Sequence, residues 1–291
     1  MTPPIAILTD FGLQDPYVGI VKGVILQRVQ TALIDLTHDI PHGDIRRTSF
    51  VLWQSLPAFP EGTVFLVVVD PGVGSARLPV IVESRGYRFV APDNGVLTYA
   101  LEGDPNARAW ALANPAFHLP LPSKTFHGRD IFAPAAAYAA LGVPGRAFGP
   151  MVPSLQRLPL PECKPEGNDY LHGEMLHADR FGNILTSLGV FRPDGDEWLL
   201  MPWLRSLEPR YFTPAAVRLP NGTLVPMVST FAEIPAGEIG ALIGSTGLIE
   251  IAANGQSAAA MLKWQPGDKV TLFSKKAYRR YQNRKKRGAH A

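Results

Sequence analysis

The order of secondary-structure patterns along the chain constrains its fold more than any other feature of the 291 residues. In the first half, apolar runs of strand length alternate with segments of helical periodicity, which predicts a parallel or mixed sheet with helices on both faces. From residue 169 onward, short β-type runs are separated by Gly, Pro and Asn, as is typical of a small barrel or sandwich. We therefore expect an α/β N-terminal domain and a smaller, all-β, barrel-like C-terminal domain.

A proline-rich stretch, PMVPSLQRLPLPECKPEGN at 150–168, separates the two patterns. Prolines at this density do not fit inside regular helices or strands, so the stretch is interpreted as a linker. The predicted organisation is an N-terminal domain over 1–152, the linker over 153–168, a C-terminal domain over 169–274 and a flexible basic tail over 275–291.

The expected elements of the N-terminal domain follow from apolar periodicity. The run TVFLVVV is apolar on both faces, as a central parallel strand should be. Strands are predicted at 4–9, 32–37, 63–69 and 87–92, and helices at 17–29, 44–56 and 130–141.

Charge is distributed unevenly along the chain. The formal net charge is +3, but the last 17 residues carry eight of the 28 basic residues and no acid, so residues 1–274 carry a net charge of −5. A tail such as SKKAYRRYQNRKKRGAHA could contact nucleic acid or an anionic membrane. A solvated, frayed terminus explains the same composition without any partner.

Cysteine content and apolar run length indicate the compartment. Cys163 is the only cysteine, so no disulfide can form within one chain, and a reducing environment is expected. It lies in the proline-rich PLPECKPEG, where an inert thiol is favoured over a nucleophile. The first residues do not resemble a signal peptide, and no apolar run reaches the length of a membrane span. We expect a cytoplasmic protein that does not enter a membrane.

Two acidic residues follow predicted strands directly: Asp10 after IAILT and Asp70 after VFLVVV. Ligands of such sheets bind beyond the carboxyl ends of the strands, so this pair is a candidate site, although capping a turn is the alternative for each. Arg77 follows Asp70 through the glycine-containing PGVGSA loop, and a structural salt bridge is its alternative role.

The segment TFHGRDIFAP places His127 just ahead of a predicted helix. A single histidine is often a structural hydrogen-bonding group. No second histidine stands at a zinc-ligand spacing, so no metal is expected.

Six short motifs are more informative together than separately. They are TDFG (9–12), VDPGVGSAR (69–77), PDNG (92–95), FHGRD (126–130), DRFGN (179–183) and GSTGLIEIA (244–252). In this order they resemble the S-adenosylmethionine hydrolases, the adenosine-forming hydroxide adenosyltransferases, which are related to the fluorinating and chlorinating enzymes that use the same substrate. The resemblance covers roughly residues 4–273.

The resemblance implies an α/β domain, a β-barrel domain and a homotrimer with its sites at subunit interfaces. It also implies a reaction in which water displaces methionine from C5′ of the ribose, giving adenosine and L-methionine. S-adenosylmethionine would be a substrate, and no cofactor is expected. Clearing a non-physiological epimer at sulfur is an expectation from the same family.

Site residues carry over from the family motif by motif. The resemblance implies catalytic roles for Asp70, Arg77 and His127, with Asp70 orienting the attacking water. It implies that Asp10 binds the ribose hydroxyls, that Asn183 reads the adenine edge, that Asp179 holds the methionine ammonium group, that Ser245 contacts its carboxylate and that Phe231 stacks on adenine. A core role is the alternative for Phe231.

Two other functions are compatible with the sequence. One is halide-dependent transfer on the same substrate; an acidic Asp70 would repel a halide, and the halogenating relatives have residues resembling Tyr-Ser where this chain has His127-Gly128. Those relatives also carry arginine at the position of Thr246. The other is a catalytically idle, adenosine-binding or regulatory module whose basic tail is the working part.

Overall fold

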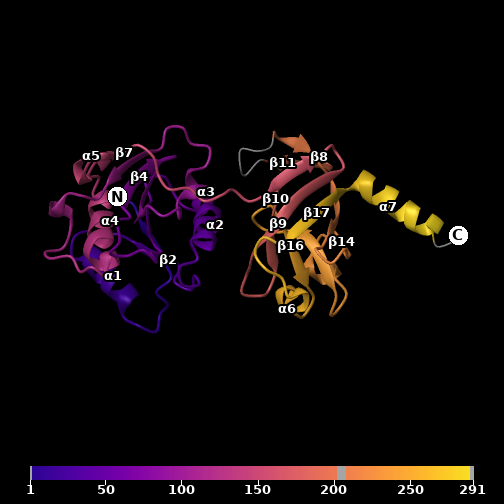
Figure 1. Ribbon diagram of the computed structural model, residues 1–291, viewed down its shortest axis with the longest axis horizontal. Helices are drawn as coiled ribbons and strands as arrows, with labels where there is room; N and C mark the ends of the chain where they lie inside the picture. Colours follow the sequence, from indigo (N-terminus) through magenta and orange to yellow (C-terminus); the bar gives the residue numbers. More distant parts are fainter. Residues whose placement is uncertain (1, 202–207, 289–291) are drawn as a thin grey trace. The chain divides into compact units, whose positions relative to one another are not determined.

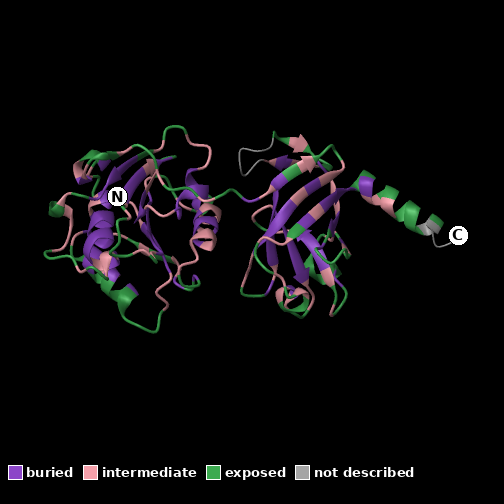
Figure 2. Ribbon diagram, in the orientation of Figure 1, coloured by how far each residue is buried: buried purple, intermediate pink, exposed green. Residues whose placement is uncertain are grey.

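The protein is described by a computed structural model covering residues 2–201 and 208–288, and its chain divides into two compact units, Met1–Pro159 and Leu160–Ala291 (Figure 1). The division falls inside the segment that was predicted to be a linker. Each unit has its own buried core (Figure 2).

Unit 1 contains a seven-stranded mixed sheet in the order β2-β1-β3-β5-β4-β6-β7. The first four strands are parallel to one another, whereas β4, β6 and β7 pair antiparallel. The strands are β1 (Ile5–Thr9), β2 (Leu33–Thr37), β3 (Val64–Val68), β4 (Pro79–Ser84), β5 (Tyr87–Pro92), β6 (Arg108–Ala111) and β7 (Met151–Val152). The prediction of a mixed sheet with flanking helices is confirmed.

Helices cover both faces of this sheet. The β3 residues Val64, Leu66 and Val68 share a core with α1 (Tyr17–Leu26) and α4 (Ala133–Ala140). The alternate residues Phe65 and Val67 share the opposite core with α2 (Ile45–Ser55) and α3 (Thr98–Leu101). The remaining helical segments are α5 (Gly145–Phe148), the 3₁₀ turns η1 (Leu56–Ala58) and η2 (Pro115–Phe117), and a π-helical turn, η3 (Gly128–Phe132).

Unit 2 is built on antiparallel pairs in the order β12-β11-β10-β9-β17-β13-β14, with β16 on β10, β15 on β16 and β8 on β9. The strands are β8 (Cys163–Glu166), β9 (Tyr170–Ala178), β10 (Ile184–Asp194), β11 (Glu197–Met201), β12 (Arg210–Tyr211), β13 (Pro214–Arg218), β14 (Leu224–Pro226), β15 (Ile239–Ile243), β16 (Leu248–Ala253) and β17 (Lys269–Ser274). Two short helical segments, η4 (Phe231–Glu233) and α6 (Ala258–Leu262), lie between strands.

The barrel expected for unit 2 is not closed by a continuous ladder. Between the β14 and β15 ends of the sheet, the described residues provide only an isolated bridge, Met227 to Ala241. The unit is therefore a mostly antiparallel sheet that is not closed into a barrel, which corrects the more specific expectation.

Two segments are more regular than their composition suggested. Residues Cys163–Glu166, inside the predicted linker, form β8, and Pro165 is accommodated because β8 pairs with a strand on one side only. The predicted flexible tail is helical over Lys275–Gly288 as α7, because Ser274 caps its first turn and Ala277 and Tyr281 pack against Phe273. Across the described ranges, none of the helices combines the length and apolarity needed to cross a bilayer.

Candidate active site

Asp70, Arg77 and His127 form one connected cluster in unit 1. Arg77 donates from Nε to Oδ1 of Asp70 over 2.9 Å and from an Nη atom to Oδ2 of the same carboxylate. The same Nη atom lies 2.8 Å from Nδ1 of His127. The side chains of Asp70 and Arg77 are 6% and 9% exposed, so this charge pair is largely shielded from water.

The loop between Asp70 and Arg77 is shaped by glycine. Asp70 lies two residues beyond the end of β3, at the carboxyl edge of the parallel strands. Gly74 has a φ of +78°, and a Cβ atom there would lie 2.6 Å from the carbonyl oxygen of Lys124. A larger residue would therefore push the loop off the segment that leads to His127.

His127 immediately precedes the π-helical turn η3, a rare conformation that is frequent at functional sites. Asp130 in this turn is buried and accepts hydrogen bonds from Arg129 and from the Ser123 amide. These bonds fix the turn, and with it the backbone that carries His127.

The protonation state of His127 follows from its partner. A guanidinium has no acceptor, so Nδ1 of His127 must accept the hydrogen bond, and the ring must be neutral with its proton on Nε2. Burial, and then the positive charge of Arg77, hold the pKa of His127 below its usual value. The ring therefore offers an N–H donor at Nε2.

Asp10 is held by the loop before α2. Its Oδ2 accepts from the Gly43 amide at 2.9 Å and lies 3.2 Å from Nδ1 of His42. The next residue, Phe11, packs edge-on against Tyr17 and Phe126, and a Cβ atom on Gly128 would lie 3.2 Å from the Phe11 ring. The TDFG and FHGRD motifs therefore contact each other through an aromatic cluster.

In unit 2, Asp179 and Asn183 hold each other in the turn between β9 and β10. Asp179 accepts from the backbone and side-chain amides of Asn183 at 2.9 and 3.0 Å. Ser245 lies exposed in the turn between β15 and β16, and Phe231, in η4, is 47% exposed.

Glu250 is a residue that the sequence reasoning did not single out. It is buried in β16, and a Cβ atom on Gly244 would lie 1.8 Å from its Oε1, so its carboxyl group lies over the GSTG turn. Burial, and then the charge of Asp179, raise its pKa. The available signal was a single acid inside the otherwise apolar LIEIAA.

Fold and site together define a class: a two-domain protein, with a mixed α/β unit and an antiparallel β unit, that carries an Asp–Arg–His cluster beyond the carboxyl edge of its parallel strands. Residues 5–149 match the SAM hydroxide adenosyltransferase N-terminal domain, and residues 173–271 match the C-terminal domain of the same family. The chain belongs to this family.

Individual relatives agree with this assignment. The chain is 43% identical to a protein of Thermus thermophilus named (R)-S-adenosyl-L-methionine hydrolase, over 93% of this chain and 99% of that one. It is 27% identical to a fluorinase of Nocardia brasiliensis, over 93% and 96% of the two chains. A crystal structure of an uncharacterized conserved protein from Thermotoga maritima superposes with a TM-score of 0.79 at 33% identity, over 92% of this chain and 99% of the other.

Proposed function

We propose that the protein hydrolyses S-adenosyl-L-methionine, with a preference for the (R) epimer at sulfur, to adenosine and L-methionine. The observation that carries the proposal is the Asp70–Arg77–His127 cluster, whose polar atoms converge within hydrogen-bond distance. The proposal is supported by relatives that match nearly the whole chain and are named (R)-S-adenosyl-L-methionine hydrolase.

The reaction requires help at the nucleophile and none at the leaving group. As the C5′–S bond breaks, its electron pair returns to sulfur and methionine leaves as a neutral thioether, so no general acid is required. Water, with a pKa of about 15.7, attacks saturated carbon poorly, so its orientation and the removal of its proton limit the step.

In this mechanism each member of the cluster has a distinct role. Asp70 accepts a hydrogen bond from the attacking water, aligns it with C5′ and takes its proton as the C5′–O bond forms, before passing the proton to solvent. Arg77 engages both carboxylate oxygens, which fixes the orientation of the carboxylate toward the attacking water. His127 positions the water through its Nε2–H donor.

The substrate would be bound by residues of both units. We propose that Asp10 accepts from the ribose hydroxyls, that Asn183 reads the adenine edge and that Phe231 stacks on the base. Asp179, together with Glu250, would hold the methionine ammonium group, and Ser245 its carboxylate. The position of Glu250 against the GSTG turn, which contains Ser245, supports this grouping.

Chromatography of the products tests the reaction. The protein is incubated with each sulfur epimer of S-adenosylmethionine, with and without halide. Adenosine plus methionine, formed independently of halide and faster from the (R) epimer, is the expected result. A halogenated nucleoside would instead identify a halogenase, and bound adenosine without turnover would identify an idle binding module.

We extend the proposal to a homotrimer with sites at subunit interfaces. Sedimentation should give the mass of three chains. If each site combines residues of two subunits, mixing inactive Asp70→Ala and Asn183→Ala variants after dissociation should restore part of the activity. A monomer that is fully active would exclude this assembly.

A further inference from the structure

The PDNG turn contains a side chain placed to act on Asp70. The turn follows β5, which is the sheet neighbour of β3. Nδ2 of Asn94 donates to the carbonyl oxygen of Val69 over 3.0 Å, and Oδ1 of Asn94 accepts from the Val96 amide over 3.2 Å. One planar amide thus connects the turn to the residue before Asp70.

The Val69 carbonyl lies where the strand ladders have ended. The parallel pairing of β3 with β1 runs to Val68, and its pairing with β5 runs only to Leu66. Val69 is fully buried, and a buried carbonyl without a partner is costly. Asn94 supplies that hydrogen bond in place of a strand.

This carbonyl belongs to the peptide unit that begins Asp70. Because the peptide is planar, holding the Val69 oxygen fixes the direction in which the Asp70 backbone, and then its carboxylate, leaves the sheet. We propose that Asn94 is a positioning residue that acts through the Val69–Asp70 peptide to aim the Asp70 carboxylate.

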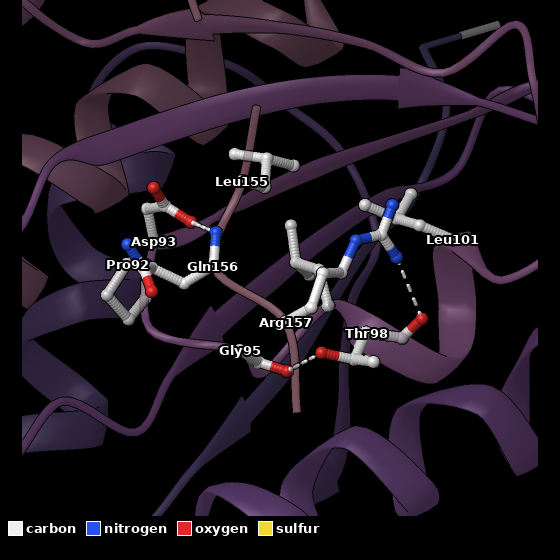
Figure 3. Close-up of a pocket in the computed structure, with 9 residues that line it drawn as sticks. Pro92, Asp93, Gly95, Thr98, Leu101, Leu155, Gln156 and Arg157 are labelled. Carbon is white, nitrogen blue, oxygen red and sulfur yellow. Dashed lines mark hydrogen bonds between the residues drawn. The ribbon is translucent and has the colours of Figure 1, made fainter. Parts of the chain in front are cut away.

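The PDNG turn and the residues after it are also hydrogen-bonded to segment 156–158, near the end of unit 1 (Figure 3). Asp93 Oδ1 accepts from the Gln156 amide at 2.7 Å, and Thr98 Oγ1 accepts from the Leu158 amide at 2.9 Å. Gly95 has a φ of +100°, and a Cβ atom there would lie 2.9 Å from the Leu158 side chain. Asn94 is therefore held between β3 and the segment 156–158.

The chain offers a matched control in Asn114. Its Nδ2 donates to the Ala147 carbonyl over 2.9 Å, and its Oδ1 accepts from the amide two residues ahead over 3.1 Å. This is the hydrogen-bond pattern of Asn94, but the carbonyl acceptor is that of Ala147 and not that of the residue before Asp70. Losing either side chain should cost similar stability, so any difference in catalysis reports positioning.

The test compares Asn94→Ala with Asn114→Ala, and Asn94→Asp with Asn114→Asp. The alanine pair adds no charge near Asp70, and the aspartate pair keeps the shape while removing the donor. For both Asn94 variants we expect kcat to fall about 10- to 100-fold, because a displacement of the Asp70 carboxylate by up to about 1 Å has an effect of this size. KM and the affinity for adenosine should stay close to wild type. Both Asn114 variants should keep wild-type kcat at a similar loss of Tm.

The inference rests on the proposed hydrolysis, so wild-type turnover is measured first. Wild-type kcat in a folded Asn94 variant, or an equal fall in the Asn114 variants, would overturn the positioning role. If the wild-type protein does not hydrolyse S-adenosylmethionine, the proposed function fails by itself. Crystal structures of the variants then decide: the inference predicts a displaced Asp70 carboxylate in Asn94→Ala, and an unchanged one would refute it.

Discussion

At the scale of single residues, the guanidinium of Arg77 determines what its neighbours can do. It donates to both oxygens of Asp70 and to Nδ1 of His127, and it stacks over the Phe132 ring at 5.2 Å. Because an arginine side chain keeps its charge and its donors over the physiological pH range, it can make these hydrogen bonds at every such pH. The cluster is therefore preorganised before substrate arrives.

Replacing Asp70 with alanine should remove turnover and leave adenosine binding close to wild type. Among the reactants, the carboxylate is proposed to contact the attacking water and not the adenosine, and a group of this kind contributes about 10²- to 10⁴-fold to the rate. Single-turnover kinetics and calorimetric titration with adenosine check the two parts. Undiminished turnover would contradict the assignment, and Asp194→Ala, in unit 2 against Tyr211, is a control that should stay active.

The pH dependence of kcat should reflect the neutral state of His127. Its pKa is lowered by burial and by Arg77, and protonation would break its hydrogen bond from Arg77. We therefore expect kcat to be flat around neutral pH and to fall only below the usual histidine pKa of about 6.5. A kcat that decreases as pH rises through this range in the wild type, with no such decrease in His127→Gln, would show that the ring acts in its protonated form.

Cys163 should resist alkylation in the folded protein. Burial raises the pKa of its thiol to about 12, and only the thiolate reacts. Native protein treated with iodoacetamide near pH 8 should stay unmodified by mass spectrometry, whereas unfolded protein should react completely. Rapid native alkylation would show that β8 opens readily.

At the scale of elements, the sequence predicted the strands and helices with long apolar periods and missed elements that depend on tertiary contacts. The parallel strands and their helices were found because their apolar periods are long. Strands β4 and β6 were not predicted; β4 forms a hairpin with the adjacent β5, but its pairing with β6 joins segments distant in sequence. Helix α7 was missed because its composition is that of a solvated tail, while its Ser274 cap and its contact with Phe273 are tertiary features.

Site prediction shows the same division. Strand ends alone indicated Asp10 and Asp70, but only the family resemblance connected them with His127, fifty residues beyond Arg77. The PDNG turn was recognised as a motif without a role, because its hydrogen bonds to Val69 and Gln156 depend on the folded chain. Glu250 was missed for a similar reason: an acid in a strand becomes informative only when its burial is known.

The junction between Asp93 and segment 156–158 should respond to pH. Burial raises the pKa of Asp93 in the folded protein, outweighing the hydrogen bond from Gln156 and the charge of Arg157. The unfolded chain therefore loses this proton first as pH rises, and ionised Asp93 destabilises the fold at neutral pH.

Asp93→Asn keeps an oxygen for the Gln156 amide and removes the charge. We expect its Tm at pH 7 to exceed that of wild type by about 1–3 °C, with the difference vanishing as pH falls towards the ordinary aspartate range of about 4. Asp104→Asn is a control with the opposite expected sign. The pKa of Asp104 is lowered, mainly by the hydrogen bond from the Ser84 hydroxyl, so its ionised form stabilises the fold and this variant should lose stability at neutral pH. Equal Tm changes in both variants, measured by calorimetry, would reject the argument.

At the scale of the whole molecule, charge is segregated along the chain. Residues 1–274 carry a net charge of −5 and the remainder carries +8. Because α7 is a helix attached to unit 2 through Ala277 and Tyr281, the basic residues of this segment are carried by a helix and not by a diffuse tail. In the sequence, the charge that could attract a polyanion therefore lies outside all the residues proposed to act on substrate.

Reversing exposed charges on α7 should therefore change polyanion binding without changing catalysis. The variant Arg284→Glu, Lys285→Glu, Arg287→Glu alters three exposed side chains and lowers the net charge by six, from +3 to −3. The wild type should be retained on heparin at low salt and released steeply as salt rises, because counterion release drives such binding. The variant should pass through with wild-type kcat. Equal retention of variant and wild type would assign the binding to basic residues outside the three substituted positions. A fall in the kcat of the variant would show that α7 contributes to catalysis.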